Sequence, residues 1–535
     1  MPAEVPVLIA GGSLNGLTAA LCLANHGIKS LVVERHPSTT VQYKFRGTSP
    51  RSMEIYRSLG IEPDVRQRDT REQSFGIARA KTLSDPNVQW QGQAWPDVSD
   101  LSPTPPATCD QDRLEPILRM HAERRGADIR FNTELTSFEQ DGNEIRARIR
   151  DVATGAEQAI TASYLIAADG ANGSTRQKLG ISRHGVGVLQ HWMNIIFETD
   201  LKPYLGGRRF TSCFVTDING SILPRDETGK WLLAVQYVPE RGESPEQFDA
   251  AHCRELVRKA AGRDDVKAEL VDARPSWEVA AYITDGFRHG RTFFVSDAAH
   301  LMPPTGGFGG NTGIHDAHNL AWKLAAVIQH GASPGLLDSY DAERRPVADA
   351  TLAQALARLA AWFKDPARRL PPPVKIVDEL NVILGQAYPA GAFVPEGSGE
   401  IFEDPRNPSG RPGTRAPHVA VERSGERLST LDLFGRGFVL LTGVRGEPWR
   451  EAAAEIAFSG GPNVDAYQFG SAGSLTDVEN RWAPIYGVNE GGAVLVRPDG
   501  IVAWRKRGAE EEPETVLRDA LEQIGLGTRE KGARS

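Results

Sequence analysis

The sequence predicts an α/β protein with three parts: a discontinuous domain built on a parallel sheet, an antiparallel sheet inserted into it, and a small C-terminal α/β domain. Three observations lead to this prediction. Strand and helix patterns alternate at the N-terminus, apolar residues alternate with period two between about 181 and 290, and a Pro/Gly-rich stretch at 389–416 precedes a further group of strands. The 535 residues are also more than one hydrophobic core usually organises.

The N-terminal segment predicts the first unit of the parallel sheet. Val5–Ala10 is an apolar strand, Leu17–Asn25 is a helix of small residues and leucines, and Leu31–Glu34 is a second strand. Strand, helix and strand in this order form a βαβ unit, whose two strands are parallel. Two later segments, Tyr164–Ala168 and Thr292–Val295, are predicted to be buried strands of the same sheet.

Period-two alternation in His191–Thr199 and Trp231–Tyr237 predicts the antiparallel sheet, which we expect to cover one side of the first domain. A long helix is expected after Asn311, with the pattern Asn319–Ala325 running to about His330, and another helix over about 335–363. We interpret 389–416 as a linker, because its prolines and glycines interrupt regular structure. The predicted C-terminal strands are Phe438–Leu441, Ala493–Val496 and, after a turn at Asp499-Gly500, Ile501–Trp504.

Composition and charge argue against several classes of protein. The formal net charge of −8 disfavours nucleic acid or an anionic membrane as the main partner. No apolar run approaches the about 20 residues that cross a bilayer, and the N-terminus lacks the basic flank of a signal peptide. We therefore expect a cytoplasmic protein without a membrane partner. The four cysteines are scattered without metal-ligand spacing, so we expect free thiols and no metal site.

The glycine-rich turn Gly11-Gly12-Ser13-Leu14-Asn15-Gly16 carries the first chemical motif. The first glycine allows a tight turn, the last lets helix and sheet pack closely, and the helix N-terminus then faces an anion. Glu34 follows about 20 positions later, where an acidic side chain binds a ribose hydroxyl. Ser13 stands where the motif usually has its second glycine. The pattern predicts a Rossmann-type dinucleotide-binding turn.

Two further motifs follow the later strands. Asp169 opens the segment 169–176, and Ser296-Asp297 opens a segment that continues into the glycine-dense loop Gly306–Asn311. A carboxylate at a strand end can bind ribose or ribityl hydroxyls, and a glycine loop running into a helix lets backbone N–H groups approach a ring edge. Each motif alone could equally be a structural strand–turn–helix corner. Their occurrence together, in this order, favours a binding site.

As a set, these motifs resemble those of the group A flavoprotein monooxygenases, the p-hydroxybenzoate hydroxylase superfamily. The chain is most similar to the actinomycete polyketide and anthracycline aglycone hydroxylases within it. The resemblance covers nearly the whole chain, and three small residues, Ser13, Gly173 and Ser296, depart from the family pattern. Further matching segments are Arg46–Glu54, Gln111–Glu115, Asn319–Ala325 and Leu337–Tyr340.

The resemblance implies a Rossmann-type FAD-binding domain at 1–180 and 285–400, an inserted substrate-binding β-sheet domain at 181–284, and a thioredoxin-like C-terminal domain at 410–535 without redox cysteines. It implies FAD as the cofactor and NADPH or NADH as the reductant, with Asp169 and Arg46 as candidates for transient nicotinamide docking. His300 is expected to be structural. The implied FAD contacts are Gly11, Ser13, Leu14, Asn15, Gly16, Glu34, Arg35, Arg46, Gln111, Asp169, Asp297, Pro304, Gly307, Gly309, Gly310 and Asn311.

The implied activity is hydroxylation of a phenolic polycyclic, polyketide-type substrate by O₂ through a C4a-hydroperoxyflavin, in a site that excludes water. Pro304, beside the flavin ring, and Arg46 are the implied catalytic residues, and Tyr237 is a candidate to hydrogen-bond the substrate phenol. Aromatic and apolar residues of the inserted sheet are candidates to line the pocket, although such residues could equally be core: Trp192, Met193, Phe197, Tyr237 and Trp277.

Three alternatives remain open from the sequence. The same flavin chemistry could insert oxygen into a polyketide ketone, as in a Baeyer–Villiger reaction, or could hydroxylate a small phenol. A non-enzymatic protein that binds a flavin or a pigment is a third possibility, although Asp169 and Asp297 are both present. We expect a monomer or a homodimer.

Overall fold

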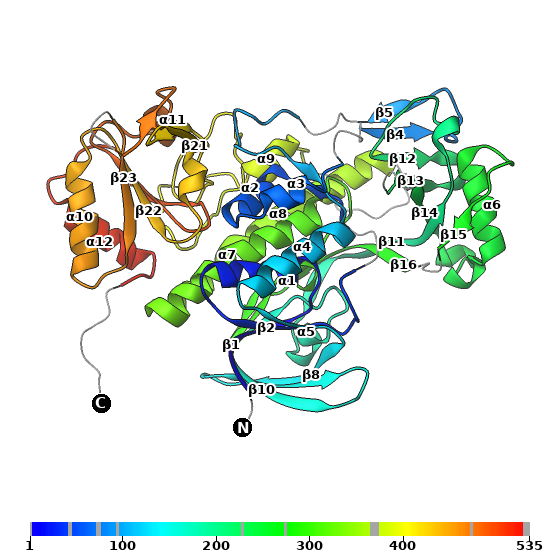
Figure 1. Ribbon diagram of the computed structural model, residues 1–535, viewed down its shortest axis with the longest axis horizontal. Coiled ribbons are helices and arrows are strands. Elements are labelled where there is room, and N and C mark those ends of the chain that lie inside the picture. Colours follow the sequence, from blue (N-terminus) through cyan, green and yellow to red (C-terminus); the bar gives the residue numbers. More distant parts are fainter. Residues whose placement is uncertain are drawn as a thin grey trace.

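The computed structural model describes residues 3–40, 45–70, 76–91, 96–225, 229–271, 275–363, 374–397, 399–470 and 474–527. Figure 1 shows three units in a row, with the N-terminal domain in the centre, a large sheet at one end and the C-terminal unit at the other. Among the helices of these described ranges, none has the length and hydropathy to cross a membrane.

The central domain contains the predicted parallel sheet. Helix α1 (Leu14–Asn25) links strands β1 (Ala3–Ala10) and β2 (Ser30–Val33), which pair in parallel, so the predicted βαβ unit is confirmed. A hairpin of β8 (Thr133–Gln140) and β9 (Ile145–Asp151) joins the sheet because β9 pairs antiparallel with residues 157–162, the first half of β10. The parallel order is β18 (Thr292–Phe294), β10 (Glu157–Ala167), β1, β2 and β7 (Asp128–Arg130), with β17 (Arg288–His289) antiparallel at the edge.

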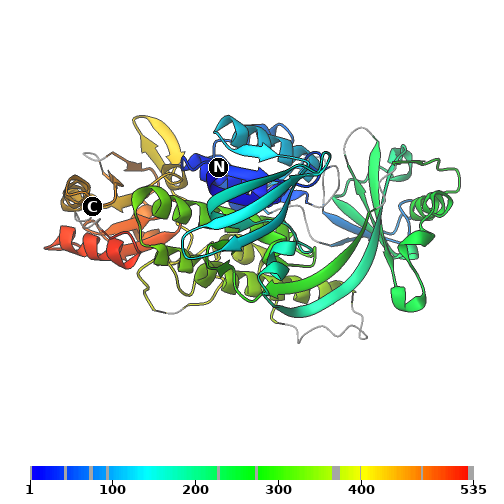
Figure 2. The same ribbon diagram turned by 90° about the horizontal axis from the view of Figure 1, so that it is seen from below.

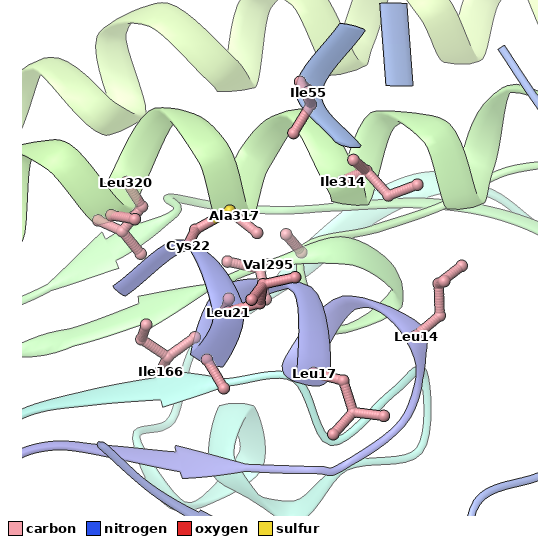
Figure 3. Close-up of a cluster of buried hydrophobic side chains, with 14 of the residues drawn as sticks. Leu14, Leu17, Leu21, Cys22, Ile55, Ile166, Val295, Ile314, Ala317 and Leu320 are labelled. Atoms are coloured by element: carbon pink, nitrogen blue, oxygen red, sulfur yellow. The ribbon is translucent and has the colours of Figure 1, made fainter. Parts of the chain in front are cut away.

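The core of this domain lies between α1 and the long helix α7 (Phe308–His330) (Figure 3). Leu17 and Leu21 of α1 are fully buried, as are Ile314 and Leu320 of α7. Because α1 consists largely of alanine and leucine, it can pack against the sheet on one side and α7 on the other. Burying each large aliphatic side chain stabilises this packing by about 1.5–3 kcal/mol.

The long helix predicted after Asn311 is confirmed as α7, although it begins at Phe308, inside the glycine-dense loop. Gly307 precedes it in the left-handed conformation, with a φ of 63°, so the glycine-rich loop itself runs into the helix. The next predicted helix is confirmed as α8 (Asp338–Phe363). Among the shorter helices, α2 (Pro50–Ser58) and α4 (Gln111–Arg124) become important for the site.

The second sheet contains the two strands predicted from period-two alternation. They are β11 (Arg183–Glu198) and β14 (Lys230–Tyr237), which pair antiparallel, and Figure 2 shows β11 and its neighbour curving away from the central domain. Helix α6 (Ala250–Ala261) packs against one face. The strand order is β19 (His300–Leu301), β16 (Ser276–Thr284), β11, β14, β13 (Gly220–Pro224), β12 (Ser212–Val215), β4 (Ile77–Ala80) and β5 (Gln89–Gln91), with β15 (Glu269–Leu270) on β11.

Three strands of this sheet lie outside the range 181–284 expected for it: β4 and β5, from residues 77–91, and β19, at residues 300–301. β4 pairs parallel to β12, so the sheet is not antiparallel throughout. Short strands of this kind show little alternation, and β4 is placed by its pairing partner rather than by a local pattern. The domain bounds themselves stay a prediction.

The C-terminal unit contains the predicted strands at Phe438–Leu441 and Ala493–Val496. Its sheet has one parallel and two antiparallel pairings, and a smaller sheet of β21 (Glu426–Ser429), β20 (Ala420–Arg423) and β24 (Thr476–Asp477) lies beside it. The thioredoxin-like description stays a prediction. The main elements are β23 (Val464–Gln468), β22 (Phe438–Thr442), β25 (Ala493–Val496) and β26 (Val502–Lys506), with helices α10 (Glu447–Phe458) and α12 (Pro513–Gln523).

Several residues of the predicted linker at 389–416 are buried and packed against the rest of the chain. Ala392, Thr414 and Ala416 are buried, and Arg415 forms a backbone bridge with Ile501. Trp322 of α7 packs edge-on against Phe438 of β22, with ring centroids 5.5 Å apart, within one apolar cluster that spans both units. Proline and glycine correctly indicated irregular backbone here, but they carried no information about its burial.

Candidate flavin site

The glycine-rich turn after β1 has the geometry that a dinucleotide-binding turn requires. Gly11 has a φ of 105°, which an L side chain rarely adopts. A Cβ atom at Gly11 would overlap the carbonyl oxygen of Ala168, and one at Gly16 would overlap the carbonyl oxygen of Gly11. The two glycines therefore allow β1, β10 and α1 to approach closely, as the sequence predicted for the first and last positions of the motif.

The N-terminus of α1 is not capped by its own side chain. Ser13 is the N-cap residue, but its hydroxyl donates to Glu115 Oε1 at 2.7 Å and accepts from Gln111 Nε2 at 3.0 Å. The helix N-terminus thus keeps its partial positive charge for an anion such as a pyrophosphate. Gln111 and Glu115, one turn apart on α4, hold the serine that replaces the usual glycine.

Glu34 follows β2 and lies against the same turn. Its Oε2 accepts the Gly12 N–H at 2.7 Å, and its Oε1 accepts the His36 N–H at 2.9 Å. A carboxylate has further acceptor capacity, so a ribose hydroxyl can still donate to it. Arg35, the next residue, is exposed.

Asp169 follows β10, and Thr175 holds its carboxylate. Asp169 Oδ2 accepts the backbone N–H of Thr175 at 3.1 Å and its hydroxyl at 2.8 Å. Burial raises the pKa of Asp169, and these two hydrogen bonds oppose that rise. A Cβ atom at Gly173 would overlap the Asp169 carboxylate. The glycine that departs from the family pattern therefore leaves room for the carboxylate as it is placed here.

Ser296, which follows β18, adopts the left-handed backbone conformation with a φ of 59°. Its hydroxyl accepts a 2.5 Å hydrogen bond from Asn15 Nδ2, and its N–H donates to Asp316 Oδ2 at 3.1 Å. A Cβ atom at Gly313 would overlap the Asn15 amide. The first and third motifs are thus joined by a direct side-chain contact, next to the exposed Asp297.

Asp316 belongs to a fully buried group of charges behind this contact. It pairs with His300 Nε2 at 2.6 Å and with Arg344 Nε at 2.8 Å. Burial alone would raise the pKa of Asp316, but the charges of His300 and Arg344 outweigh it and lower the pKa to about 2. The burial and pairing of His300 agree with the structural role expected for it.

The glycine-dense loop exposes its backbone at the surface, and the buried side chain of Asn311 holds it from the inside. Pro304 and Gly307 are exposed, and the Gly307 N–H donates to the Pro304 carbonyl at 3.0 Å. Asn311 is buried: its Oδ1 accepts from Ser49 N at 2.9 Å, and its Nδ2 donates to the Gly307 carbonyl at 2.9 Å. Gly309 and Gly310 lie in the first turn of α7. Asn311, in the same turn, fixes the loop through its hydrogen bonds to Ser49 and Gly307.

Arg46 lies at the boundary with the second sheet. Its guanidinium donates to the carbonyls of Thr211 at 3.2 Å and Pro224 at 2.8 Å, and its Nε lies 3.4 Å from Asp110 Oδ1. In this position Arg46 ties the central domain to the second sheet. Its predicted contact with the pyrophosphate and its catalytic role stay predictions.

The topology brings the predicted cofactor residues to one edge. β18, β10, β1 and β2 are neighbours in the parallel sheet, so Asp297, Asp169, Gly11 and Glu34 all follow carboxyl ends at the same edge. Asp169 and Asp297 also line one small pocket together with Arg183 and Tyr282. The uncapped helix N-terminus, the glycine turn and the strand-end carboxylates fit FAD, with phosphate at α1 and hydroxyl groups at the carboxylates.

The predicted substrate-lining residues fall on opposite faces of the second sheet. Trp192 and Trp277 stack with ring centroids 5.9 Å apart in a cluster that includes Leu359 of α8. Tyr237 instead packs against Phe248 in the cluster beneath α6, and Met193 and Phe197 share that cluster. Only the first face lies toward the central domain, so the geometry does not favour Tyr237 as a substrate-binding residue.

Comparison with known proteins agrees with this geometry. A family model described as "FAD binding domain" matches residues 4–355, and one described as "Aromatic-ring hydroxylase, C-terminal" matches residues 409–526. The chain belongs to the FAD-dependent aromatic-ring hydroxylases. The family predicted from the motifs is therefore confirmed, and so is the expectation of a flavoprotein monooxygenase.

Three relatives align over nearly the full length of the chain. The tetracenomycin A2 monooxygenase-dioxygenase of Streptomyces glaucescens is 40% identical over 97% of both chains. Aklavinone 12-hydroxylase RdmE of Streptomyces purpurascens is 39% identical over 97% of this chain and 99% of its own. The 4-methyl-5-nitrocatechol 5-monooxygenase of a Burkholderia species is 39% identical over 97% of both.

Solved structures show the same likeness. A ternary complex of aklavinone-11 hydroxylase with FAD and aklavinone matches with a TM-score of 0.90 and 38% identity, covering 98% of this chain and 99% of the other. The flavin-dependent monooxygenase PieE, in complex with FAD and substrate, matches with a TM-score of 0.87 and 30% identity, covering 98% and 100%.

Sequence reasoning did not assign several residues that support the site. Glu115 stands four positions after Gln111, a spacing that places both on one helix face, so this contact could have been foreseen. Asp316 and Arg344 lie on different helices and meet only in the folded chain. No local sequence pattern predicts an ion pair between residues on two different helices.

Proposed function

We propose that this protein hydroxylates a phenolic polycyclic substrate of the polyketide type, using FAD, a nicotinamide cofactor and O₂. The observation that carries the proposal is the full-length match, at a TM-score of 0.90, to an aromatic hydroxylase whose structure holds both FAD and a polycyclic substrate. The arrangement of Gly11, Glu34, Asp169 and Asp297 along one sheet edge supports FAD as the bound group.

In this proposal the protein binds and orients the cofactor and excludes water. The α1 N-terminus and the Ser13–Gln111–Glu115 contact receive the pyrophosphate, and Glu34 binds the adenosine ribose. Asp297 accepts from the ribityl chain. Bound FAD would supply the redox chemistry that takes electrons from NADPH or NADH and activates O₂.

The exposed Pro304 and Gly307 form the surface on which the flavin ring would lie, with Gly309 and Gly310 at its edge. Because α7 starts here, its N-terminal dipole favours negative charge on the ring. The substrate would lie between this surface and the face of the second sheet that carries Trp192 and Trp277. With that face over the ring, water would be excluded from the place where bound FAD would activate oxygen.

A small phenol is a second candidate substrate. One relative of equal similarity is a monooxygenase of 4-methyl-5-nitrocatechol, a single-ring compound. Overall identity therefore does not discriminate single-ring from multi-ring substrates. The discriminating region is the apolar face beside α8, where Trp277 and Trp362 contribute to one cluster.

The proposal is tested by adding NADPH to the FAD-loaded protein with a panel of polycyclic phenols and single-ring phenols. We expect polycyclic phenols to accelerate NADPH oxidation most and to yield products heavier by one oxygen atom. Turnover restricted to single-ring phenols would support the second candidate. A lactone or ring-opened product would indicate Baeyer–Villiger insertion, and a protein that binds flavin without any turnover would overturn the enzymatic proposal.

A further inference from the structure

A buried ion pair joins the C-terminal domain to helix α2. Arg415 Nε donates to Glu54 Oε2 at 2.9 Å, and Arg415 Nη2 also contacts Glu54 Oε1 and donates to the Leu101 carbonyl at 2.8 Å. The two side chains are only 8% and 3% exposed. Burial raises the pKa of Glu54, and the charges of Arg415 and Arg51 outweigh that effect, so the carboxylate stays ionised.

Arg51 makes a second connection from α2 to the same domain. It donates from Nη1 to Glu54 Oε2 at 3.0 Å and from Nη2 to the carbonyl of Asp499 at 2.6 Å. One turn of α2 is therefore fixed to two separate segments of the C-terminal domain. A buried charge left without its partner is costly, so these contacts hold α2 firmly.

The N-terminal turn of α2, next to Glu54, contacts the glycine-dense loop. Ser49 N and Ser52 Oγ both donate to Asn311 Oδ1, at 2.9 and 2.7 Å. Asn311 Nδ2 in turn donates to the carbonyls of Gly47 and Gly307, both at 2.9 Å. A single asparagine thus joins the start of α2 to the loop on which the flavin ring would lie.

These contacts form a continuous path from the C-terminal domain to the flavin loop. Arg415 holds Glu54, Glu54 lies on the same short helix as Ser52, and Ser52 holds Asn311. Ser52 stands two positions before Glu54 and Ser49 caps the same helix, so a displacement at Glu54 moves both serines as well. Backbone positions at such a site need to be held within fractions of an ångström for efficient catalysis.

We propose that the C-terminal domain positions the flavin loop through α2, with Arg415 as the positioning residue. The inference rests on the proposed flavin site. It assigns the C-terminal domain a role without redox chemistry: it supports the loop from Gly306 to Asn311 from behind and thereby sets how tightly and in what environment the flavin ring is held.

The chain supplies a matched control on the same helix. Arg57, at the other side of α2, forms a two-pronged ion pair with Asp432, with N–O distances of 2.6 and 3.1 Å. This pair also joins α2 to the C-terminal domain, but it is 38% and 21% exposed and lies beyond Glu54 from Asn311. Its loss should leave the Ser49 and Ser52 end in place. A second control is Leu517→Ala, which weakens the C-terminal core at α12 rather than at α2.

The experiment compares full-length wild-type protein with Arg415→Met, Arg415→Lys, Asp432→Asn and Leu517→Ala. The readouts are the dissociation constant of FAD, measured by quenching of flavin fluorescence, the visible absorption spectrum of bound FAD, and thermal stability. We expect the dissociation constant to rise about tenfold in Arg415→Met, with an altered spectrum. Arg415→Lys should recover part of the affinity, and both controls should resemble wild type in affinity and spectrum.

Unchanged affinity and spectrum in Arg415→Met would overturn the inference. So would an equal loss of affinity in Arg415→Met and Leu517→Ala, because general destabilisation would then explain it. If Arg415→Met does not fold, Glu54→Asp takes its place, because it keeps the charge but shortens the side chain. We then expect a smaller rise in the dissociation constant of FAD, and unchanged affinity and spectrum would again overturn the inference. A wild-type protein that binds no FAD would instead overturn the proposed flavin site.

Discussion

Ser296 shows at the residue scale how a departure from the family pattern is accommodated. A glycine would adopt its φ of 59° without strain, whereas serine costs about 1–2 kcal/mol there. The hydrogen bond from Asn15 Nδ2 offsets part of that cost and joins two motifs that are 281 residues apart. The Asn15 side chain in the first glycine turn therefore helps the site to accept a serine at this position.

This account predicts an unusual order of stabilities at position 296. Ser296→Ala keeps the backbone strain and loses the Asn15 contact, whereas Ser296→Gly loses the contact but also relieves the strain. We expect the glycine variant to be more stable than the alanine variant by about 1 kcal/mol. Urea unfolding of both variants measures the difference. An alanine variant as stable as the glycine variant would show that the left-handed conformation costs nothing.

Gly173 gives a second prediction at this scale. A Cβ atom there would overlap the Asp169 carboxylate, which Thr175 holds by two hydrogen bonds. We expect Gly173→Ala to displace the carboxylate and to lower the free energy of unfolding by about 1–3 kcal/mol. Gly142→Ala is the control, since a Cβ atom at Gly142 has no neighbour within 4 Å. Equal stability of the two variants would contradict the proposed crowding.

At the scale of helices and strands, the sequence predicted elements with a strong local pattern. The unit β1–α1–β2 was found from its apolar runs and the helix between them, and the strand β14 from its period-two alternation. Helix α7 was predicted after Asn311, and only its first turn from Phe308 was placed in the loop, because glycines at 309 and 310 weaken the helical pattern and Asn311 is held by contacts from α2. β4 was missed for a similar reason, since its place depends on β12.

The candidate site divides in the same way. Gly11, Glu34, Asp169 and Asp297 were predicted because each stands at a strand end with a recognisable spacing. Contacts between distant segments could not be predicted, among them Asn15–Ser296 and Arg415–Glu54. Period-two alternation showed that Tyr237 lies on a buried face of its strand. It could not show that helix α6, rather than the central domain, covers that face.

Two buried carboxylates, Asp316 of α7 and Asp499 of the C-terminal unit, predict how stability depends on pH. Burial would raise the pKa of Asp316 and of Asp499, but neighbouring positive charges lower both pKa values to about 2, below the ordinary value of 3.8. A carboxylate with a depressed folded-state pKa stabilises the fold above the unfolded value, and that stabilisation is lost as the pH falls from about 4 toward 2. Each group contributes about 2 kcal/mol.

Urea unfolding at about pH 6 and at about pH 3 tests this dependence. We expect Asp316→Asn to be less stable than wild type at the higher pH and to lose less further stability on acidification, because its contribution is already absent. The exposed Asp519→Asn is the control and should follow the wild-type profile. A wild-type pH dependence retained in Asp316→Asn would show that Asp316 does not contribute.

At the scale of the whole molecule, the C-terminal domain shares its core and its buried charges with the central domain. Arg497 donates to both oxygens of Glu343 at 2.8 and 2.9 Å, and Lys323 pairs with Glu343 at 2.8 Å. All three side chains are fully buried, and Trp322 packs beside them against Phe438. Without the C-terminal domain, the central domain would therefore expose apolar and charged side chains that are now buried.

A chain that ends at residue 400 should consequently fail to form a stable monomer. Truncation exposes Trp322 and leaves Glu343 without Arg497, which removes apolar contact and unbalances a buried charge group. Size-exclusion chromatography and near-ultraviolet circular dichroism of the truncated chain test this expectation, and the full-length protein is the reference. A monomeric truncated chain with the native spectrum would contradict the shared core.

The central claim is that the flavin held at this sheet edge transfers one oxygen atom from O₂ to a polycyclic phenol. The most direct test supplies isotopically labelled dioxygen to the FAD-loaded protein with NADPH and such a substrate, and measures the product mass. We predict a hydroxylated product that carries one labelled oxygen atom. NADPH oxidation that yields only hydrogen peroxide across the panel, or a product whose added oxygen comes from water, would contradict the account.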